Sequence, residues 1–316
     1  MTLARRLLTA VAVLLGVTLL TFLILDRLPS NAAEQMMGGE ATPQRLAQLE
    51  KKLHLDRPVW QRYLEWLQRA SLGDLGESLV SGQPVSRLLK DRIPVSAELI
   101  AVALVLSVGA AIPAALIAAR RPDGPADRSM RAIGIFGLSV PSYVLALLLV
   151  WIFSVKLHVL PSMGFSPLSA GLLRHLGSLV LPSAAIALPL FCFYTSFLRN
   201  DLVQQMHSED YVTTALATGL SRWRTLTRHA FRNSLFGFLS VLGLHLGALI
   251  GGTVIVEQVF ALPGIGQLLL QGINLRDIAI VQAIVLLSAV ATVAISMCLD
   301  LLYAAIDPRI RYRSAD

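Results

Sequence analysis

The chain has 316 residues, of which 55% are hydrophobic and only 15% are charged, and its formal net charge is +7. Soluble domains carry about 25% charged residues, so this balance excludes an ordinary soluble globular protein. The sequence has no G-x-x-x-x-G-K-[ST] phosphate-binding loop and no cysteine–histidine cluster with metal-site spacing, which excludes ATP hydrolysis by a P-loop and a structural zinc site.

The first predicted element is an apolar run at residues 7–25, led by Arg5 and Arg6. A spanning helix needs about 20 apolar residues, whereas the apolar core of a cleavable signal peptide is usually about 7–15 residues long. We therefore predict a retained first span with a cytoplasmic N-terminus. A signal peptide is the alternative.

A polar, mixed segment follows at residues 29–94. Residues 43–55 and 59–67 have helical periodicity, and the aromatic residues of the second stretch could form a small core or lie at a membrane interface. Glycine and proline residues then predict a loop and a short helix. We expect this segment to be a helical insertion between the first two spans.

Five further apolar segments predict five more spans, at residues 95–119, 133–155, 179–198, 237–256 and 278–306. With six spans, both termini, the link 120–131 and the segment 199–236 lie on one side of the membrane. These stretches hold most of the arginines, so that side is predicted to be cytoplasmic. Prolines within these spans predict bent helices: Pro113, Pro141, Pro182 and Pro189.

The long polar stretch at residues 201–236 is predicted to form two short helices broken at Gly219. The first, around residues 208–218, has Ser208 as its expected N-cap and acidic residues in its first turn. The second begins near Ser221 and is rich in arginine. The small residues Ala215 and Ala217 would let a partner approach closely. The alternative is a solvated helical loop.

Glu257 is the notable charge between the last two spans, and the Pro-Gly-x-Gly sequence after it forces a turn. The alternative is a structural turn with a surface glutamate. Ionisable groups at membrane depth suggest function, and His245 is the deepest, with Glu98 and Asp300 nearer to span ends. A lone histidine is more often hydrogen-bonded between helices than bound to a metal, and we predict no metal site.

The stretch DYVTTALATGLSRWRTLTRHAFRNSL resembles the "EAA" loop of ABC-importer permeases, and most closely that of the oligopeptide/dipeptide/nickel family. The matching residues are Tyr211, Thr214, Ala215, Ala217, Gly219, Leu220, His229, Ala230, Arg232 and Asn233. Two positions depart from the family pattern: Thr213 stands where the general motif has glutamate, and Gly237 stands where a proline often follows. The D-x-P…Y…W and G-D-x-G-x-S sequences before residue 79 and the E-x-x-F-x-x-P-G-x-G sequence from Glu257 also resemble this family.

The resemblance implies an all-α membrane protein with six transmembrane helices of the type I ABC-importer permease kind. Its parts would be a first transmembrane helix (1–28), an extracytoplasmic helical region (29–94), a five-helix permease core (95–306) with a cytoplasmic coupling loop (200–236), and a cytoplasmic tail (307–316). The implied ATPase-coupling residues are Glu209, Asp210, Tyr211, Thr214, Ala215, Ala217, Gly219, Leu220 and Arg232. The candidates for the pathway or gate are His245, Glu257, Pro263, Gly264 and Gly266.

The resemblance also implies the partners. They are a second homologous permease subunit, cytoplasmic ATP-binding subunits that carry ATP and magnesium, an extracytoplasmic substrate-binding protein and the lipid of a bacterial inner membrane. No nucleic acid, no cofactor on this chain and no catalytic residue are expected. The implied cargo is di- or oligopeptides, with nickel or a metal–chelator complex as the alternative. An ATP-independent secondary transporter is the alternative from another class, although the internal repeats usual in that class are not seen.

Overall fold

The computed structural model describes residues 3–27 and 57–306. Within these ranges the chain is helical and has no strand, apart from an isolated bridge between Glu77 and Pro84. The predicted all-α class is confirmed for this part of the chain. The predicted helix at 43–55 and the tail at 307–316 lie outside the described residues.

The helices follow one another along the chain as α1 (Leu3–Arg27), α4 (Val59–Ser71), α5 (Val85–Arg120), α6 (Pro125–Ser139), α7 (Ser142–Leu149), a π-helix (Val150–Lys156), a 3-10 turn (Leu168–Ala170), α8 (Leu172–Ser208), α9 (Asp210–Ala217), α10 (Arg222–Thr225), a π-helix (Leu226–Ala230), α11 (Phe231–Gly252), α12 (Val254–Val259), α13 (Ile265–Asn274) and α14 (Ile278–Ile306). Five helical segments of the described chain are long and apolar enough to cross a membrane, and six if the bent pair α6–α7 is one span. This agrees with the predicted six spans.

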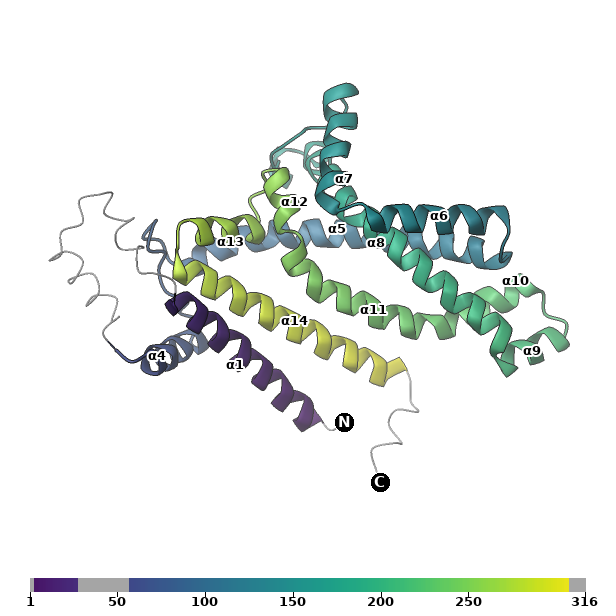
Figure 1. The fold of residues 1–316 in the computed structure, drawn as a ribbon, viewed down its shortest axis with the longest axis horizontal. Coiled ribbons are helices and arrows are strands. Elements are labelled where there is room, and N and C mark those ends of the chain that lie inside the picture. Colours follow the sequence, from purple (N-terminus) through teal and green to yellow (C-terminus); the bar gives the residue numbers. More distant parts are fainter. Residues whose placement is uncertain (1–2, 28–56, 307–316) are drawn as a thin grey trace.

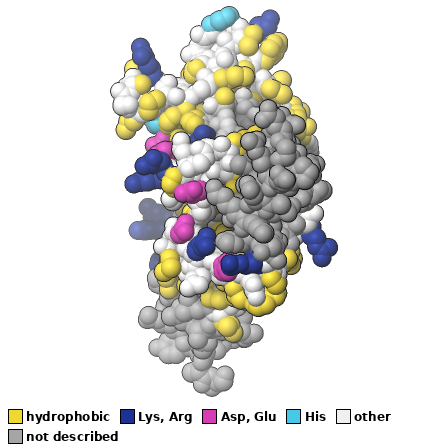
Figure 2. Space-filling view, turned by 90° about the vertical axis from the view of Figure 1, so that its left-hand side faces the viewer, with side chains coloured by type: hydrophobic (Ala, Val, Ile, Leu, Met, Phe, Trp, Pro, Cys, Tyr) yellow, Lys and Arg dark blue, Asp and Glu magenta, His cyan; other side chains and the backbone are white. Residues whose placement is uncertain are grey.

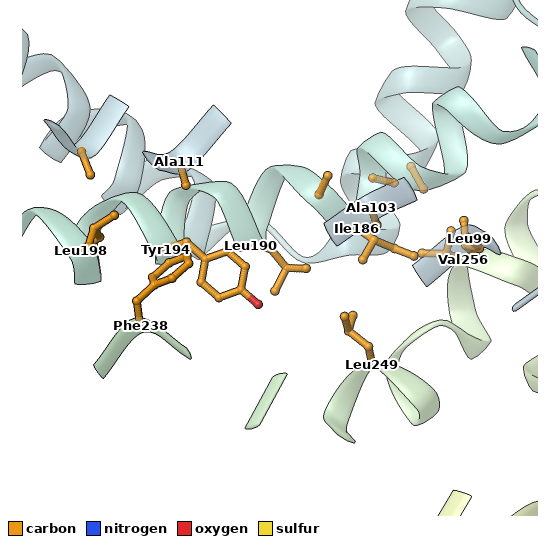
Figure 3. Close-up of a cluster of buried hydrophobic side chains, with 14 of the residues drawn as sticks. Leu99, Ala103, Ala111, Ile186, Leu190, Tyr194, Leu198, Phe238, Leu249 and Val256 are labelled. Atoms are coloured by element: carbon orange, nitrogen blue, oxygen red, sulfur yellow. The ribbon is translucent and has the colours of Figure 1, made fainter. Parts of the chain in front are cut away.

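The core lies between α5 and α8, which run side by side, with α11 and α12 closing one side (Figures 1 and 3). The α5 side of the contact is made of small residues, including Ala103, Ala111 and Ala115, which are fully buried. Small side chains let two helix backbones approach closely, which is how spanning helices associate where lipid removes most of the hydrophobic driving force. The larger side chains Leu190, Tyr194 and Leu198 of α8 fill the space that remains (Figure 3).

Helix α1 lies apart from this core, beside α14 (Figure 1). Its C-terminal half packs against α4, where the Phe22 and Tyr63 rings meet edge to face with centroids 5.6 Å apart. The hydroxyls of Thr18 and Tyr63 are hydrogen-bonded at 2.9 Å. Tyr63 of α4 is thus part of a small aromatic core with Phe22, whereas Trp60 is 61% exposed.

Two of the predicted spans are longer in the structure than the sequence predicts. Helix α5 begins at Val85, so the predicted short helix and the second span are one helix, which accommodates Pro94 and Pro113. Helix α8 continues to Ser208, ten residues beyond the predicted end of the fourth span and well into the predicted loop 200–236. Helical periodicity does not stop where hydrophobicity stops, so an apolar run gives the buried length of a helix and not its full length.

The predicted third span is not one straight helix, because α6 and the helical stretch that begins with α7 meet at an angle of 100°. Val140 and Pro141 between them are extended, with ψ angles of 121° and 144°. A residue before proline is driven out of the helical region, and this accounts for the break. The bend predicted at Pro141 is confirmed, while Pro182 and Pro189 lie within the continuous helix α8.

Candidate functional site

Helix α9 is the candidate coupling helix, and it is held between two sharp turns. Glu209, with extended backbone angles, ends α8 and is the N-cap of α9. The prediction that Ser208 caps this helix is wrong, because the Ser208 hydroxyl donates to the Gln204 carbonyl at 2.8 Å within α8. Asp210 is in the first turn of α9 as expected, where the helix dipole favours an acidic group.

The end of α9 is a glycine turn of the Schellman type. Gly219 has a φ of +89°, a left-handed conformation that costs glycine little. Its N–H donates to the Leu216 carbonyl at 3.0 Å, and the Leu220 N–H donates to the Ala215 carbonyl at 3.2 Å. The break predicted at Gly219 is confirmed, and it directs the chain into α10.

The two faces of α9 differ in what they offer a partner. Val212 and Ala215, one turn apart, are buried against the rest of the chain. Leu216 and Ala217 point outward, and Leu216 is 41% exposed. The small size of Ala215 therefore serves packing inside this chain, whereas Ala217 is open to an approaching surface.

Tyr211 fixes α9 to the end of α8, because its hydroxyl donates to the Gln205 side-chain carbonyl at 2.5 Å. Burial raises the pKa of this phenol, so it stays neutral. The other implied coupling residues are exposed or half-buried around the same end of the molecule: Glu209, Asp210, Thr214, Gly219, Leu220 and, on the first turn of α11, Arg232.

Helices α10 and α11 form one continuous rod through a π-helical turn at Leu226–Ala230. The Ser221 hydroxyl accepts the Arg224 N–H at 3.4 Å and caps the start of this rod. The predicted second short helix is therefore the first part of the fifth span. Because the glycine turn leads directly into the rod, α9 is attached to a spanning helix on each side.

Glu257 lies at the far end of that rod, in α12, and is completely buried. Its carboxylate accepts hydrogen bonds from the hydroxyls of Ser96 at 2.6 Å and Thr253 at 3.1 Å, and from the Gln267 N–H at 3.0 Å. The alternative of a surface glutamate is wrong. A buried carboxylate is stable only when its oxygens are hydrogen-bonded, and here three segments of the chain supply the donors.

The Pro-Gly-x-Gly turn packs directly on this carboxylate. A Cβ atom added to Gly264 would overlap the Glu257 side chain, and one on Gly266 would lie 3.0 Å from Glu257 Oε2 and 2.6 Å from the Val254 Cα. Ser96 also accepts the Ile265 N–H at 2.8 Å. The structure thus brings Glu257, Gly264 and Gly266 together with Ser96 of α5, with Pro263 half-buried beside them; we call Ser96, Thr253, Glu257 and residues 264–267 the carboxylate cluster.

His245 lies elsewhere, in the middle of α11 and against α8. Its ring meets those of Phe193 and Tyr194 edge to face, with centroids 4.7 and 5.4 Å away. Its Nδ1 atom and the Tyr194 hydroxyl are buried and have no hydrogen-bond partner among the described residues. The described contacts of the His245 ring therefore do not include the expected hydrogen bond between helices. The Nδ1 atom of His245 and the hydroxyl of Tyr194 both lie in an apolar core, and Figure 3 shows Tyr194 there.

Two buried carboxylates were missed by sequence reasoning. Asp127, in the predicted basic link, accepts two hydrogen bonds from the Arg199 guanidinium at 2.6 and 2.7 Å and joins α6 to α8. Asp277 accepts the Ser78 hydroxyl at 2.6 Å and joins the loop before α5 to the start of α14. The partners are 72 and 199 residues apart, and only the Ser78 motif gave any signal in the sequence.

The two remaining ionisable candidates are Glu98 and Asp300. Glu98 lies 3.5 Å from the His175 Nε2 atom near the end of α5 that carries the carboxylate cluster. The side chain of Asp300 is outside the described residues. In the part of the chain that the structure describes, no three His, Cys, Asp or Glu side chains are grouped so that they could hold a metal ion.

Comparison with known families gives two matches that together cover nearly the whole chain. Residues 111–312 match the family described as "Binding-protein-dependent transport system inner membrane component". Residues 1–100 match the corresponding N-terminal family.

Individual relatives agree with these matches. A putative peptide transport system permease protein of Brucella abortus is 37% identical over 308 residues, which is 98% of each chain. The glutathione transport system permease protein of Escherichia coli O6:H1 is 34% identical and the oligopeptide transport system permease protein of Bacillus subtilis is 32% identical, again over 98% of both chains.

Proposed function

The chain belongs to the family of binding-protein-dependent transport system inner membrane components, and on that basis we propose that it forms the translocation pathway of an ATP-driven importer of short peptides. It is a multi-pass membrane protein of the permease class and not itself the catalytic component. A substrate-binding protein would deliver the peptide, and a second homologous permease would complete the pathway. Relatives named for peptide, oligopeptide and glutathione transport support short peptides as cargo.

The observation that carries the ATP-driven role is the geometry of α9. Its inner face is anchored by Val212 and Ala215, and its outer face presents Leu216 and Ala217 at one end of the helical bundle (Figure 1). A short helix that projects from a bundle and is tied to a spanning helix on each side suits contact with a separate protein. We infer that this protein is the ATPase, which would bind ATP and magnesium.

The proposed orientation puts α9 and both termini in the cytoplasm and residues 29–94 outside. Arginines concentrate at the α9 end, as the positive-inside rule requires. The opposite end exposes both signs of charge, for example Arg87, Lys90 and Asp91 on the first turns of α5. Figure 2 shows basic and acidic side chains interspersed over the described part of that end, which supports it as the face for a soluble binding protein.

The carboxylate cluster would join three helices near the outer end of the pathway, since its donors come from α5, from the residue before α12 and from the first turn of α13. Tyr194 is fully buried, whereas His245 is half-buried and its Nδ1 atom has no described partner, so of the two we assign only the imidazole to contact with the polar backbone of a passing peptide. The metal–chelator alternative has less support, because His245 has no second metal-binding side chain beside it among the described residues.

The test is co-purification of the ATPase with the full-length chain from membranes in mild detergent. Ala217→Arg adds a long charged side chain to the outer face of α9, and we expect it to abolish recovery of the ATPase without changing the amount of permease in the membrane. Ala217 is the better position for this test than Ala215, because an arginine at the buried Ala215 would disturb the fold of the chain itself.

Ser129→Arg is the matched control, because Ser129 is exposed on α6 at the same end of the molecule and outside α9. It should leave ATPase recovery unchanged. Full ATPase recovery with Ala217→Arg would contradict the coupling assignment. Peptide uptake that continues without any ATPase would favour a secondary transporter.

A further inference from the structure

A second site lies beside the candidate coupling helix. A pocket of about 580 Å³ opens between the end of α5, α8 and the start of α10. Arg120, Arg121, Arg222 and Trp223 line it together with the apolar side chains of Met206 and Leu226. None of the proposed coupling contacts on the outer face of α9 involves these side chains.

The positive charge of this pocket is not balanced by the protein that the structure describes. No acidic residue is among the described side chains that line it. The two acidic residues of the link that follows Arg121 and Pro122 are already paired, since Asp127 binds Arg199 and Asp123 binds Arg131. Three arginines that line one cavity carry like charges, so an anion bound among them would be favoured.

The arginines are also arranged for a ligand of particular chemistry. The Arg120 guanidinium lies over the Trp223 ring, 5.5 Å from its centroid, which orients its planar fork. Arginine binds phosphate oxygens with two parallel hydrogen bonds, and such pairs are stronger than those of neutral groups. The apolar floor formed by Met206 and Leu226 suits a ligand that has an uncharged part next to its phosphate.

The volume of the pocket and its position along α5 further restrict which ligands fit. A free phosphate ion displaces only a few waters, each with a share of roughly 30 Å³ of liquid volume, and would leave most of this cavity empty. Arg120 is the first charged residue after the apolar run of α5, so the pocket lies where that helix leaves the hydrocarbon. Basic pockets between spanning helices at this depth recognise anionic lipid headgroups, and tryptophan concentrates there.

We propose that this pocket binds the phosphodiester headgroup of an anionic phospholipid. The headgroup would join Arg120 and Arg121, at the end of α5, to Arg222, at the start of the rod that follows α9. The lipid would thereby hold the base of the candidate coupling helix against the core. The proposed orientation decides only which leaflet supplies the lipid.

The test is native mass spectrometry of the full-length chain in detergent, with phosphatidylglycerol or zwitterionic phosphatidylcholine added at equal concentrations. We expect the wild-type chain to retain phosphatidylglycerol preferentially. The double variant Arg120→Gln with Arg222→Gln should bind it roughly 30-fold more weakly, because each basic side chain near a membrane surface contributes about a factor of five. Arg128→Gln with Arg224→Gln, two exposed arginines outside the pocket, should bind it as the wild type does.

Equal retention of the two lipids by the wild type, or equal loss in both double variants, would overturn the proposal. Thermal stabilisation by millimolar inorganic phosphate that equals the effect of phosphatidylglycerol would assign the pocket to free phosphate instead. Loss of the ATPase from the Arg120/Arg222 variant with unchanged lipid binding would assign it to an acidic protein surface.

Two further measurements cover the case in which the glutamine variant does not fold. Arg120→Lys with Arg222→Lys keeps the charge but not the bidentate geometry, and it should weaken phosphatidylglycerol binding by a smaller factor. Raising the salt concentration from about 0.1 M to about 1 M shortens the screening length from roughly 10 Å to 3 Å and should release the lipid from the wild type. Binding that is insensitive to salt would overturn the proposal. Neither measurement involves ATP or transport, so failure of the importer assignment would not produce the same result.

Discussion

At the scale of single residues, the carboxylate cluster shows how one buried carboxyl group restricts which residues can lie beside it. Glu257 has no exposed surface, and each of its described hydrogen bonds comes from a different position of the chain. Gly264 and Gly266 lie beside it, at positions where even a Cβ atom would be too close to neighbouring atoms. The consequence is that small changes next to the carboxylate should matter more than large changes a few residues away.

Gly264→Ala is the sharpest test of this cluster. The added methyl group would overlap the Glu257 carboxylate, and overpacking of this kind costs about 1–3 kcal/mol of unfolding free energy. Gly251→Ala is the matched control, because a Cβ atom there meets nothing within 4 Å, and its effect should stay within about 1 kcal/mol. Denaturant titration of both variants in detergent measures the difference. Equal effects would show that the turn is not packed on the carboxylate.

His245→Phe separates packing from transport. The new ring can keep the edge-to-face contact with Phe193, so the unfolding free energy should change by about 1 kcal/mol or less. If the imidazole contacts the passing peptide, the variant loses one hydrogen bond of about 1.4 kcal/mol. Peptide uptake into cells should then fall roughly tenfold. Wild-type uptake by this variant would return His245 to a packing role.

At the scale of elements, the long helices are held in place by a few polar contacts. The Asp127–Arg199 pair joins α6 to α8 and the Asp277–Ser78 bond joins the first loop of the core to α14. Sequence patterns located the helices themselves well: the sixth span was predicted with the bounds that α14 has, and the Gly219 break was placed correctly. Periodicity reports how a residue relates to its own helix, so it could not identify partners that come from distant parts of the chain.

The same limit explains the errors in α9. The pattern of small residues was recognised, yet only the structure shows that Ala215 faces inward and Ala217 outward. A helix of eight residues has too few turns for its apolar face to be distinguished by periodicity. The prediction that Ser208 caps α9 was wrong for a related reason. The polar sequence just before Ser208 gives no sign that α8 continues through it.

Asp127→Asn should destabilise the chain strongly. It leaves the Arg199 guanidinium, only 13% exposed, without its anionic partner, and removing one member of a buried pair costs about 3–5 kcal/mol. The control is Asp123→Asn, because Asp123 is 74% exposed in its pair with Arg131 and such pairs contribute about 0–1 kcal/mol. Denaturant titrations compare the two variants. Equal losses would show that the buried pair has no special role in joining α6 to α8.

At the scale of the whole molecule, the two ends of the bundle differ in charge. One end has the arginine-lined pocket and α9, whereas the other exposes charges of both signs (Figure 2). This asymmetry is the basis for the proposed orientation in the membrane. It also separates the face proposed for the ATPase from the face proposed for the binding protein by the full length of the spanning helices (Figure 1).

Single cysteines test that orientation directly. In a Cys298→Ser background, which removes the exposed native thiol, Ser81→Cys should react with a membrane-impermeant maleimide in spheroplasts. Thr218→Cys, beside the candidate coupling helix, should react only after the membrane is permeabilised. Both positions are exposed, so a difference in labelling reports the side of the membrane. Labelling of Thr218→Cys in intact spheroplasts would reverse the proposed topology.

The continuous rod from α10 through α11 has a mechanical consequence. At 1.5 Å per residue, the stretch from Arg222 to Gly252 is roughly 45 Å long. It begins at the glycine turn after α9 and ends beside the carboxylate cluster. A lever of this length that pivots at one end by about 5° displaces the other by about 4 Å, which exceeds the length of any hydrogen bond to Glu257. A small rotation at the α9 end is therefore enough, by geometry alone, to separate contacts at the Glu257 end.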